Sequence, residues 1–225
     1  MAVEGFPTDR YSGRGLIVGR SAGGESWLQI YWLSGRSENS RNRVLIEEEG
    51  QIRTATADAS RQVDGTYLLY TALCSVDGEH IVGNGDQVKT VSETLAAGGS
   101  FEQALRTRSV EEDPPIWTPR ITAIVSGDGL RLSKIGKNGH AFFEAASLEP
   151  GQGLCLHTYR GDGNPILPFN EDPYPVRLEG DIDELAQSSW EQLDPELRVA
   201  LAVKEIGADG SFRHVVVNRL AIPAG

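Results

Sequence analysis

Short apolar runs separated by glycine-containing turns extend through most of the chain. Many of these runs contain β-branched or aromatic residues, which is typical of β-strands. The Asn-Gly and Asp-Gly pairs in the turns favour tight hairpins. The sequence therefore predicts antiparallel sheets, with strands expected in the runs at residues 15–19, 27–33, 43–47, 51–57, 66–76, 120–126, 130–136, 140–147, 153–161, 197–207 and 211–222.

Helical patterns interrupt the strands in two places. Residues 86–97 have apolar side chains at helical spacing, and Ser100 is placed to cap a second short helix over 101–108. Residues 181–193 open with acidic side chains, which suit a helix N-terminus, and keep their apolar residues on one side. The expected architecture is an α+β fold in which helices pack on stacked antiparallel sheets, and we expect residues 1–225 to form a single domain.

Composition excludes several classes of protein. The net charge of −11 and the pI near 4.8 argue against nonspecific binding to nucleic acid or to an anionic membrane surface. No apolar run approaches the roughly 20 residues that a membrane span needs, and the N-terminal stretch lacks a secretory signal, so a cytoplasmic location is expected. Cys74 and Cys155 are expected to be buried thiols, and the spacing of the histidines indicates no metal site.

The stretch GRSENSRNR, residues 35–43, concentrates positive charge in this acidic chain. Arg36, Arg41 and Arg43 lie between two apolar runs, with serine and asparagine side chains between them. Guanidinium groups and neutral donors together suit a phosphate monoester, because charge-assisted hydrogen bonds can hold one anion whatever the net charge of the protein. The alternative is a solvated loop whose arginines pair with Glu38 and with the acidic residues 47–49.

Two further stretches are weaker candidates. VGNGDQV, residues 82–88, leads from a strand into a helix, so its glycines could let a ligand approach the helix start, although turn geometry alone also explains them. EEDPPIWTPRI, residues 111–121, offers Glu112 as a general base and Arg120 as an anion ligand on a proline-stiffened segment. Its alternative is a solvated acidic linker followed by a strand-edge arginine.

Five blocks of sequence, taken in order, resemble the single-domain IMP cyclohydrolase family first known from archaea, and in particular its bacterial relatives. The blocks are YSGRGLIVGRS, GRSENSRNR, YTALCSVDGEHIVGNGD, DPPIWTPRI and HTYRGDGNPILPF, and they extend from Tyr11 to Phe169. The resemblance implies a four-layer αββα sandwich of antiparallel sheets, like that of the N-terminal-nucleophile hydrolases. The terminal nucleophile itself would be missing, in agreement with Ala2 as the first residue after the initiator methionine.

The resemblance also implies an activity, which is closure of 5-formamidoimidazole-4-carboxamide ribonucleotide to IMP in purine biosynthesis. It implies a small mononucleotide as partner, with no metal or redox cofactor. The family's catalytic positions fall on Arg36, Tyr70 and Glu112, with Glu111 and Asp113 as adjacent alternatives for the acid or base. The substrate contacts that we expect from it are Arg14, Asn39, Arg43, Asn84 and Arg120.

Two alternatives stay open at this point. One is a noncatalytic purine-nucleotide-binding protein, and the other is an amide or formamide hydrolase of the same fold that acts on a related nucleotide. The sequence leaves the oligomeric state open, a homo-oligomer included. It also leaves open whether the proline-rich and glycine-rich loop at 161–175 closes on a ligand.

Overall fold

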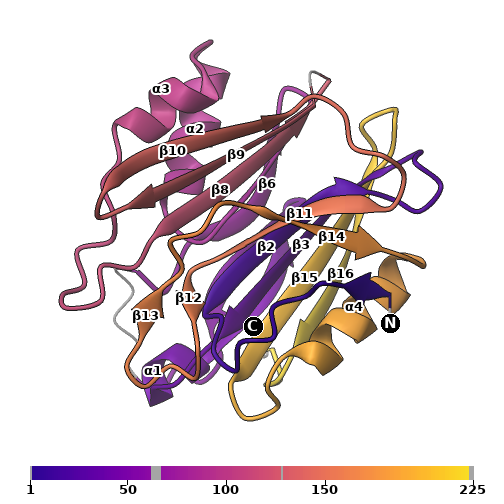
Figure 1. The fold of residues 1–225 in the computed structure, drawn as a ribbon. Helices are drawn as coiled ribbons and strands as arrows, with labels where there is room; N and C mark the ends of the chain where they lie inside the picture. The colour runs from indigo at the N-terminus through magenta and orange to yellow at the C-terminus, as the bar shows by residue number, and fades with distance from the viewer. Residues whose placement is uncertain (1, 62–66, 128, 223–225) are drawn as a thin grey trace.

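The computed structural model describes residues 2–61, 67–127 and 129–222. Two seven-stranded sheets, in which all strand pairs are antiparallel, make up most of it (Figure 1). The first sheet has the order β1 (Val3–Glu4), β14 (Tyr174–Leu178), β11 (Gln152–His157), β2 (Arg14–Arg20), β3 (Trp27–Ser34), β15 (Arg198–Ile206) and β16 (Phe212–Asn218). The second has the order β10 (Gly139–Ala145), β9 (Gly129–Gly136), β8 (Arg120–Ser126), β7 (Glu79–Gly83), β6 (Thr71–Val76), β5 (Gln51–Thr56) and β4 (Arg43–Glu48).

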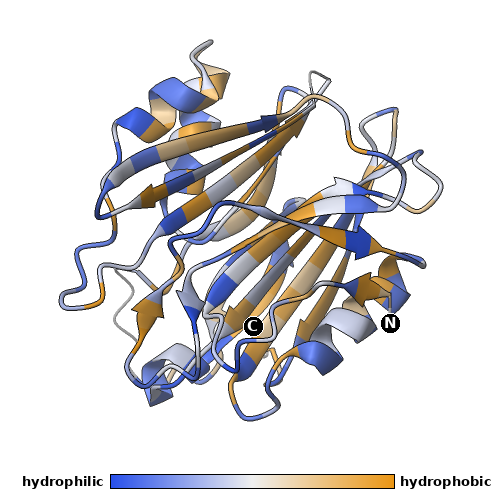
Figure 2. Cartoon of the chain, viewed as in Figure 1, coloured by the Kyte–Doolittle hydropathy of each residue, from blue (hydrophilic) through white to orange (hydrophobic). Residues whose placement is uncertain are grey.

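The main hydrophobic core lies between the two sheets. Alternate residues of each strand enter it, such as Leu16 and Val18 from β2 and Ile121 and Ala123 from β8. The residues between them face outward into two further apolar clusters under the helices, as Ile17 does on β2. The central strands β3 and β15 are buried on both faces, so their sequences form nearly continuous apolar runs, whereas edge strands such as β10 also carry hydrophilic residues (Figure 2).

Helices cover the outer face of each sheet. α4 (Ile182–Gln192) packs on the first sheet through an apolar side that includes Leu185, and α2 (Gln87–Ala96) and α3 (Phe101–Arg106) pack on the second (Figure 1). Ser100 forms a capping box with Gln103 at the start of α3, as Asp181 does with Glu184 at the start of α4. The α+β sandwich and its three main helices are therefore as predicted.

Several elements differ from the sequence-based expectations. The run expected as one strand over 66–76 begins its strand only at Thr71, and Thr66 lies outside the described residues. The stretch 35–43 contains a single helical turn, α1 (Glu38–Arg41), capped by the Ser37 side chain. The loop at 161–175 contains β13 (Leu167–Pro168), which pairs with β12 (Tyr159–Arg160). None of the helices in the described part of the chain is long and apolar enough to cross a membrane.

Candidate active site

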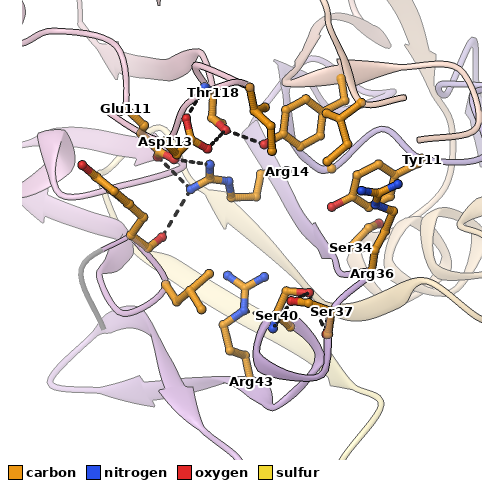
Figure 3. Close-up of a pocket in the computed structure, with 16 residues that line it drawn as sticks. Tyr11, Arg14, Ser34, Arg36, Ser37, Ser40, Arg43, Glu111, Asp113 and Thr118 are labelled. Carbon is orange, nitrogen blue, oxygen red and sulfur yellow. Dashed lines mark hydrogen bonds and ion pairs between the residues drawn. The ribbon is translucent and has the colours of Figure 1, made fainter. Parts of the chain in front are cut away.

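A cavity of about 360 Å³ opens at one end of the sandwich, where segments from both sheets meet (Figure 3). The first sheet contributes Arg14 at the start of β2 and Ser34 at the end of β3. The rest of the lining comes from the arginine-rich loop, from the start of β4 and from three irregular segments. The full lining is Tyr11, Gly13, Arg14, Ser34, Arg36, Ser37, Ser40, Arg43, Tyr67, Leu68, Glu111, Asp113, Ile116, Thr118, Tyr159 and Ile166.

A buried ion pair forms one wall of this cavity. The Arg14 guanidinium donates to both carboxylate oxygens of Glu111, over 2.9 Å from Nη1 and 2.7 Å from Nη2, and Nη1 also donates to the Asn84 carbonyl oxygen over 2.6 Å. The side chains of Arg14 and Glu111 are 9% and 2% exposed. Burial raises the pKa of the Glu111 carboxyl, and the charge of Arg14 opposes that rise. Because a guanidinium keeps its proton, the pair holds a carboxylate in a fixed position against the cavity.

Two arginines face this pair across the cavity (Figure 3). Arg43 is 2% exposed, and its Nε donates to the Ser40 carbonyl oxygen over 2.8 Å, but its buried Nη1 has no hydrogen-bond partner among the described residues. Arg36 is exposed, and its guanidinium carbon lies 5.4 Å from the centre of the Tyr11 ring. The hydroxyl groups of Ser37 and Ser40 line the cavity beside them. The Ser37 hydroxyl donates to that of Ser40, which donates to the Ser37 carbonyl oxygen, so these two hydroxyls are held in place at the start of α1. The unsatisfied donor of Arg43 and the exposed guanidinium of Arg36 beside them form a site suited to an anion such as a phosphate.

A chain of hydrogen bonds from Tyr159 to Asp113 forms another part of the lining. The hydroxyl groups of Tyr159 and Thr118 are hydrogen-bonded to each other, and the Thr118 hydroxyl donates to Asp113 Oδ2. Burial raises the pKa of Tyr159 to about 12, so that its phenol keeps its proton at neutral pH. Gly13, with φ +72, makes this packing feasible, because a Cβ there would lie 2.3 Å from Tyr159 Cδ2.

The structure brings together three of the predicted site residues, because Arg14, Arg36 and Arg43 all line the cavity. Arg41 does not line it, and its Nε donates to the Gly35 carbonyl oxygen. The acidic segment is displaced by one residue from the prediction. Glu112 is exposed and outside the lining, whereas its neighbours Glu111 and Asp113 are part of it. Asn39 is exposed on α1 and also lies outside the lining.

The remaining predicted residues have structural partners instead. Tyr70 is 8% exposed and its hydroxyl meets that of Tyr31 at 2.6 Å, outside the cavity lining. The Asn84 side chain donates to the Pro119 carbonyl and accepts from Gln87 and from the Ile121 amide.

Arg120 is paired with Asp86, and its Nε donates to the Ser109 carbonyl oxygen. In the stretch VGNGDQV, Gly83 allows two segments to pack closely. A Cβ on Gly83 would lie 2.9 Å from the Ile121 carbonyl oxygen. Asn84 and Arg120 therefore hold the loops behind Arg14 and Glu111 in place.

Sequence reasoning missed five polar side chains of the lining, which are Tyr11, Ser34, Tyr67, Thr118 and Tyr159. A signal for Tyr11, Thr118 and Tyr159 was available, because each belongs to one of the five ordered blocks, YSGRG, TPRI and HTYRG. Their side chains carry no charge, so a search for acids, bases and cations passed over them. Tyr11 and Tyr159 stack on one another with ring centroids 5.5 Å apart.

Comparison with known proteins shows the family of this chain. A family described as IMP cyclohydrolase-like protein matches residues 11–210, and the chain belongs to that family. An IMP cyclohydrolase of Halobacterium salinarum is 28% identical over 164 residues, which cover 71% of this chain and 78% of the relative. The same enzyme from a second strain of that organism matches equally well. The matched region includes every residue of the cavity lining.

Proposed function

We propose that this protein is an IMP cyclohydrolase, which converts 5-formamidoimidazole-4-carboxamide ribonucleotide to IMP and water. The observation that carries the proposal is that the cavity has a negative group on one side and a positive group on the other. A fixed carboxylate, Glu111, lies on one side, and an arginine with an unsatisfied donor, Arg43, lies on the other. A mononucleotide substrate needs both an anion site and, near its base, groups that move protons.

The phosphate site that we propose consists of Arg36 and Arg43, with the hydroxyls of Ser37 and Ser40. Arg14 is less suited to this task, because its charge is already paired with the buried carboxylate of Glu111. Arg43 has the opposite character, since its Nη1 is buried without a partner. An unsatisfied buried donor costs free energy in the empty protein, so an anion that accepts from it gains affinity at that position.

The chemical step moves two protons from nitrogen to the departing oxygen. The carboxamide nitrogen loses one proton as it attacks the formyl carbon, whose oxygen becomes the hydroxyl of a tetrahedral adduct. The formamide nitrogen then loses the second proton as that hydroxyl is protonated and leaves as water. We assign the removal of the carboxamide proton to Glu111 in place of Glu112, because Glu111 lines the cavity with a pKa raised by burial. We assign polarisation of the formyl oxygen to Tyr159 in place of Tyr70, because its phenol lines the cavity and keeps its proton. In the protein without substrate this proton is donated to Thr118, so the assignment requires the hydroxyl to turn from Thr118 to the formyl oxygen.

The finer assignments of fold and setting are part of the same proposal. One core cluster shared by both sheets supports a single domain over residues 1–225. The position of helices on both outer faces supports an αββα arrangement of the kind seen in N-terminal-nucleophile hydrolases. A cytoplasmic location and a homo-oligomeric state remain predictions.

The test is IMP formation from freshly formylated substrate, followed against the uncatalysed cyclisation. We expect acceleration by the wild type and a KM raised about tenfold to a hundredfold in Arg43→Met, because one hydrogen bond between charged groups contributes about 1.5–3 kcal/mol. Methionine keeps the apolar packing of the arginine stem. Arg53→Met is the matched control, since Arg53 is 41% exposed and pairs with Glu48 away from the cavity.

Two results would count against this function. If the wild type binds IMP but does not accelerate cyclisation, the protein is a nucleotide-binding protein without catalysis. If Arg43→Met and Arg53→Met have equal KM values, Arg43 does not hold the phosphate, and the anion site must be sought elsewhere.

A further inference from the structure

A second cavity, of about 410 Å³, lies behind the wall of the first. The segment 113–119 separates the two. Asp113 and Thr118 face the first cavity, and Pro115, Trp117 and Pro119 face the second. Ile116, and Ile166 from another segment, line both. The second cavity is otherwise lined by β9, β10, the turn between them, and the segment from Ile166 to Asn170. It is thus a separate space that adjoins the candidate active site.

The charge of this second cavity is opposite to that of the chain. Its lining includes Lys134, Lys137 and His140, and no aspartate or glutamate is among the described residues that form it. The Lys134 ammonium donates to the carbonyl oxygens of Asn170 and Glu171. Neither lysine forms a salt bridge with a carboxylate within the described residues. The carboxylates of Asp172 and Glu171 act on Lys134 from outside the lining, so Lys137 is the lysine left for a ligand. In a protein of net charge −11, such a lysine in a cavity without a carboxylate in its described lining is a local site for an anion.

The ring of Trp117 gives this cavity an aromatic wall. Lys137 Nζ lies 5.2 Å from the centre of that ring, so cation and ring already face the same space. Trp117 has φ +56, in the left-handed region that a bulky side chain rarely adopts. Asp113 holds this backbone, because its Oδ1 accepts from the Thr118 amide over 2.7 Å. Residues held in such conformations are concentrated at sites that bind ligands.

We propose that the second cavity is a binding site for a planar aromatic anion, of the nucleoside monophosphate class. The base stacks on Trp117, and the phosphate reaches Lys137 at the rim, with the side-chain amide groups of Asn138 and Asn170 as further donors. The cavity is as large as the one proposed for the substrate, about 410 Å³ against about 360 Å³. This ligand site is additional to the catalytic one, and the segment 113–119 is in contact with both.

The test is calorimetric titration with AMP of the wild type and of a double variant, Arg36→Met with Arg43→Met, in which the first site is weakened. We expect the double variant to retain one equivalent of bound AMP. Adding Lys137→Gln to it is expected to weaken that binding about tenfold, the effect of one charged hydrogen bond. Trp117→Gly is expected to weaken it as well, and glycine tolerates the positive φ at that position. Lys89→Gln, at an exposed lysine on α2, is the matched control.

Two partial ligands test the two halves of the site. Adenosine, without phosphate, and ribose 5-phosphate, without a base, are each expected to bind the double variant more weakly than AMP. Loss of all AMP binding in the double variant would overturn the proposal, because every bound nucleotide would then occupy the first cavity. AMP binding that neither Lys137→Gln nor Trp117→Gly changes would overturn it equally. Far-ultraviolet circular dichroism checks that each variant is folded.

Discussion

Glu111→Gln is expected to lower the free energy of unfolding by about 3–5 kcal/mol and the turnover rate by about 10²–10⁴-fold. The substitution keeps the shape of the side chain but leaves the buried Arg14 guanidinium without a negative partner. Glu112→Gln is the matched control, because Glu112 is exposed and surface changes of this kind stay within about 0.5 kcal/mol. Urea denaturation and the cyclisation assay measure the two effects. Loss of turnover in Glu112→Gln alone would reverse our assignment of the base.

A double variant separates the structural role of Glu111 from its chemical role. Arg14→Met combined with Glu111→Gln removes both charges, so no unpaired ion remains in the interior. We expect it to recover much of the stability that Glu111→Gln loses, since buried ion pairs are often replaceable by apolar side chains at little cost. Turnover should stay low, because no carboxylate then faces the substrate. Recovery of turnover together with stability would show that Glu111 acts only through folding.

Local patterns explain why the fold could be predicted from the sequence. The α3 and α4 helices each begin with a capping residue and its partner three positions later, and both signals depend only on neighbouring residues. The central strands such as β3 and β15 were equally recognisable, because burial on both faces makes them continuously apolar. The strands β7 and β14 lie outside the predicted runs. The short strands β1 and β13 gave no such signal, since two residues cannot display a period.

The site was less predictable because irregular segments do not fix side-chain directions. In the run Glu111, Glu112, Asp113 no helical or strand period indicates which carboxylate turns inward, and the structure turns the first and third toward the cavity. Charge alone was also ambiguous. Arg120 and Arg43 are both buried arginines at the start of a strand, yet Arg120 is paired with Asp86 while Arg43 keeps an unsatisfied nitrogen. Only the tertiary contacts distinguish a structural arginine from a binding one.

A buried lysine far from both cavities has no part in the proposed chemistry. Lys204, on β15, is fully buried, and its Nζ donates to the Ser75 hydroxyl over 2.6 Å and lies 4.1 Å from the centre of the Phe212 ring. No carboxylate forms a salt bridge with it in the described parts of the chain. Three titratable groups interact with its charge, and they are His80, His214 and Cys74. The Ser75 hydroxyl is also hydrogen-bonded to Nδ1 of His80. Burial lowers the pKa of Lys204 to about 8 and that of His80 to about 4.

Lys204→Met is therefore expected to stabilise the protein at pH 7, by up to about 3 kcal/mol, since each unit of pKa shift is worth about 1.36 kcal/mol. The unfolded chain binds a proton at Lys204 up to about pH 10.4, whereas the folded protein loses it above about pH 8. Between these values Lys204 makes the wild type more stable as pH rises, so the advantage of the variant should shrink across that interval. Thermal and urea unfolding of both proteins from pH 7 to 10 measure the difference in stability, from which the contributions of distant titrating groups cancel.

Lys89→Met, at an exposed lysine, is the control and should change stability little at any pH. A variant less stable than the wild type at pH 7 would mean that the bond to Ser75 and the contact with Phe212 outweigh the cost of the buried charge.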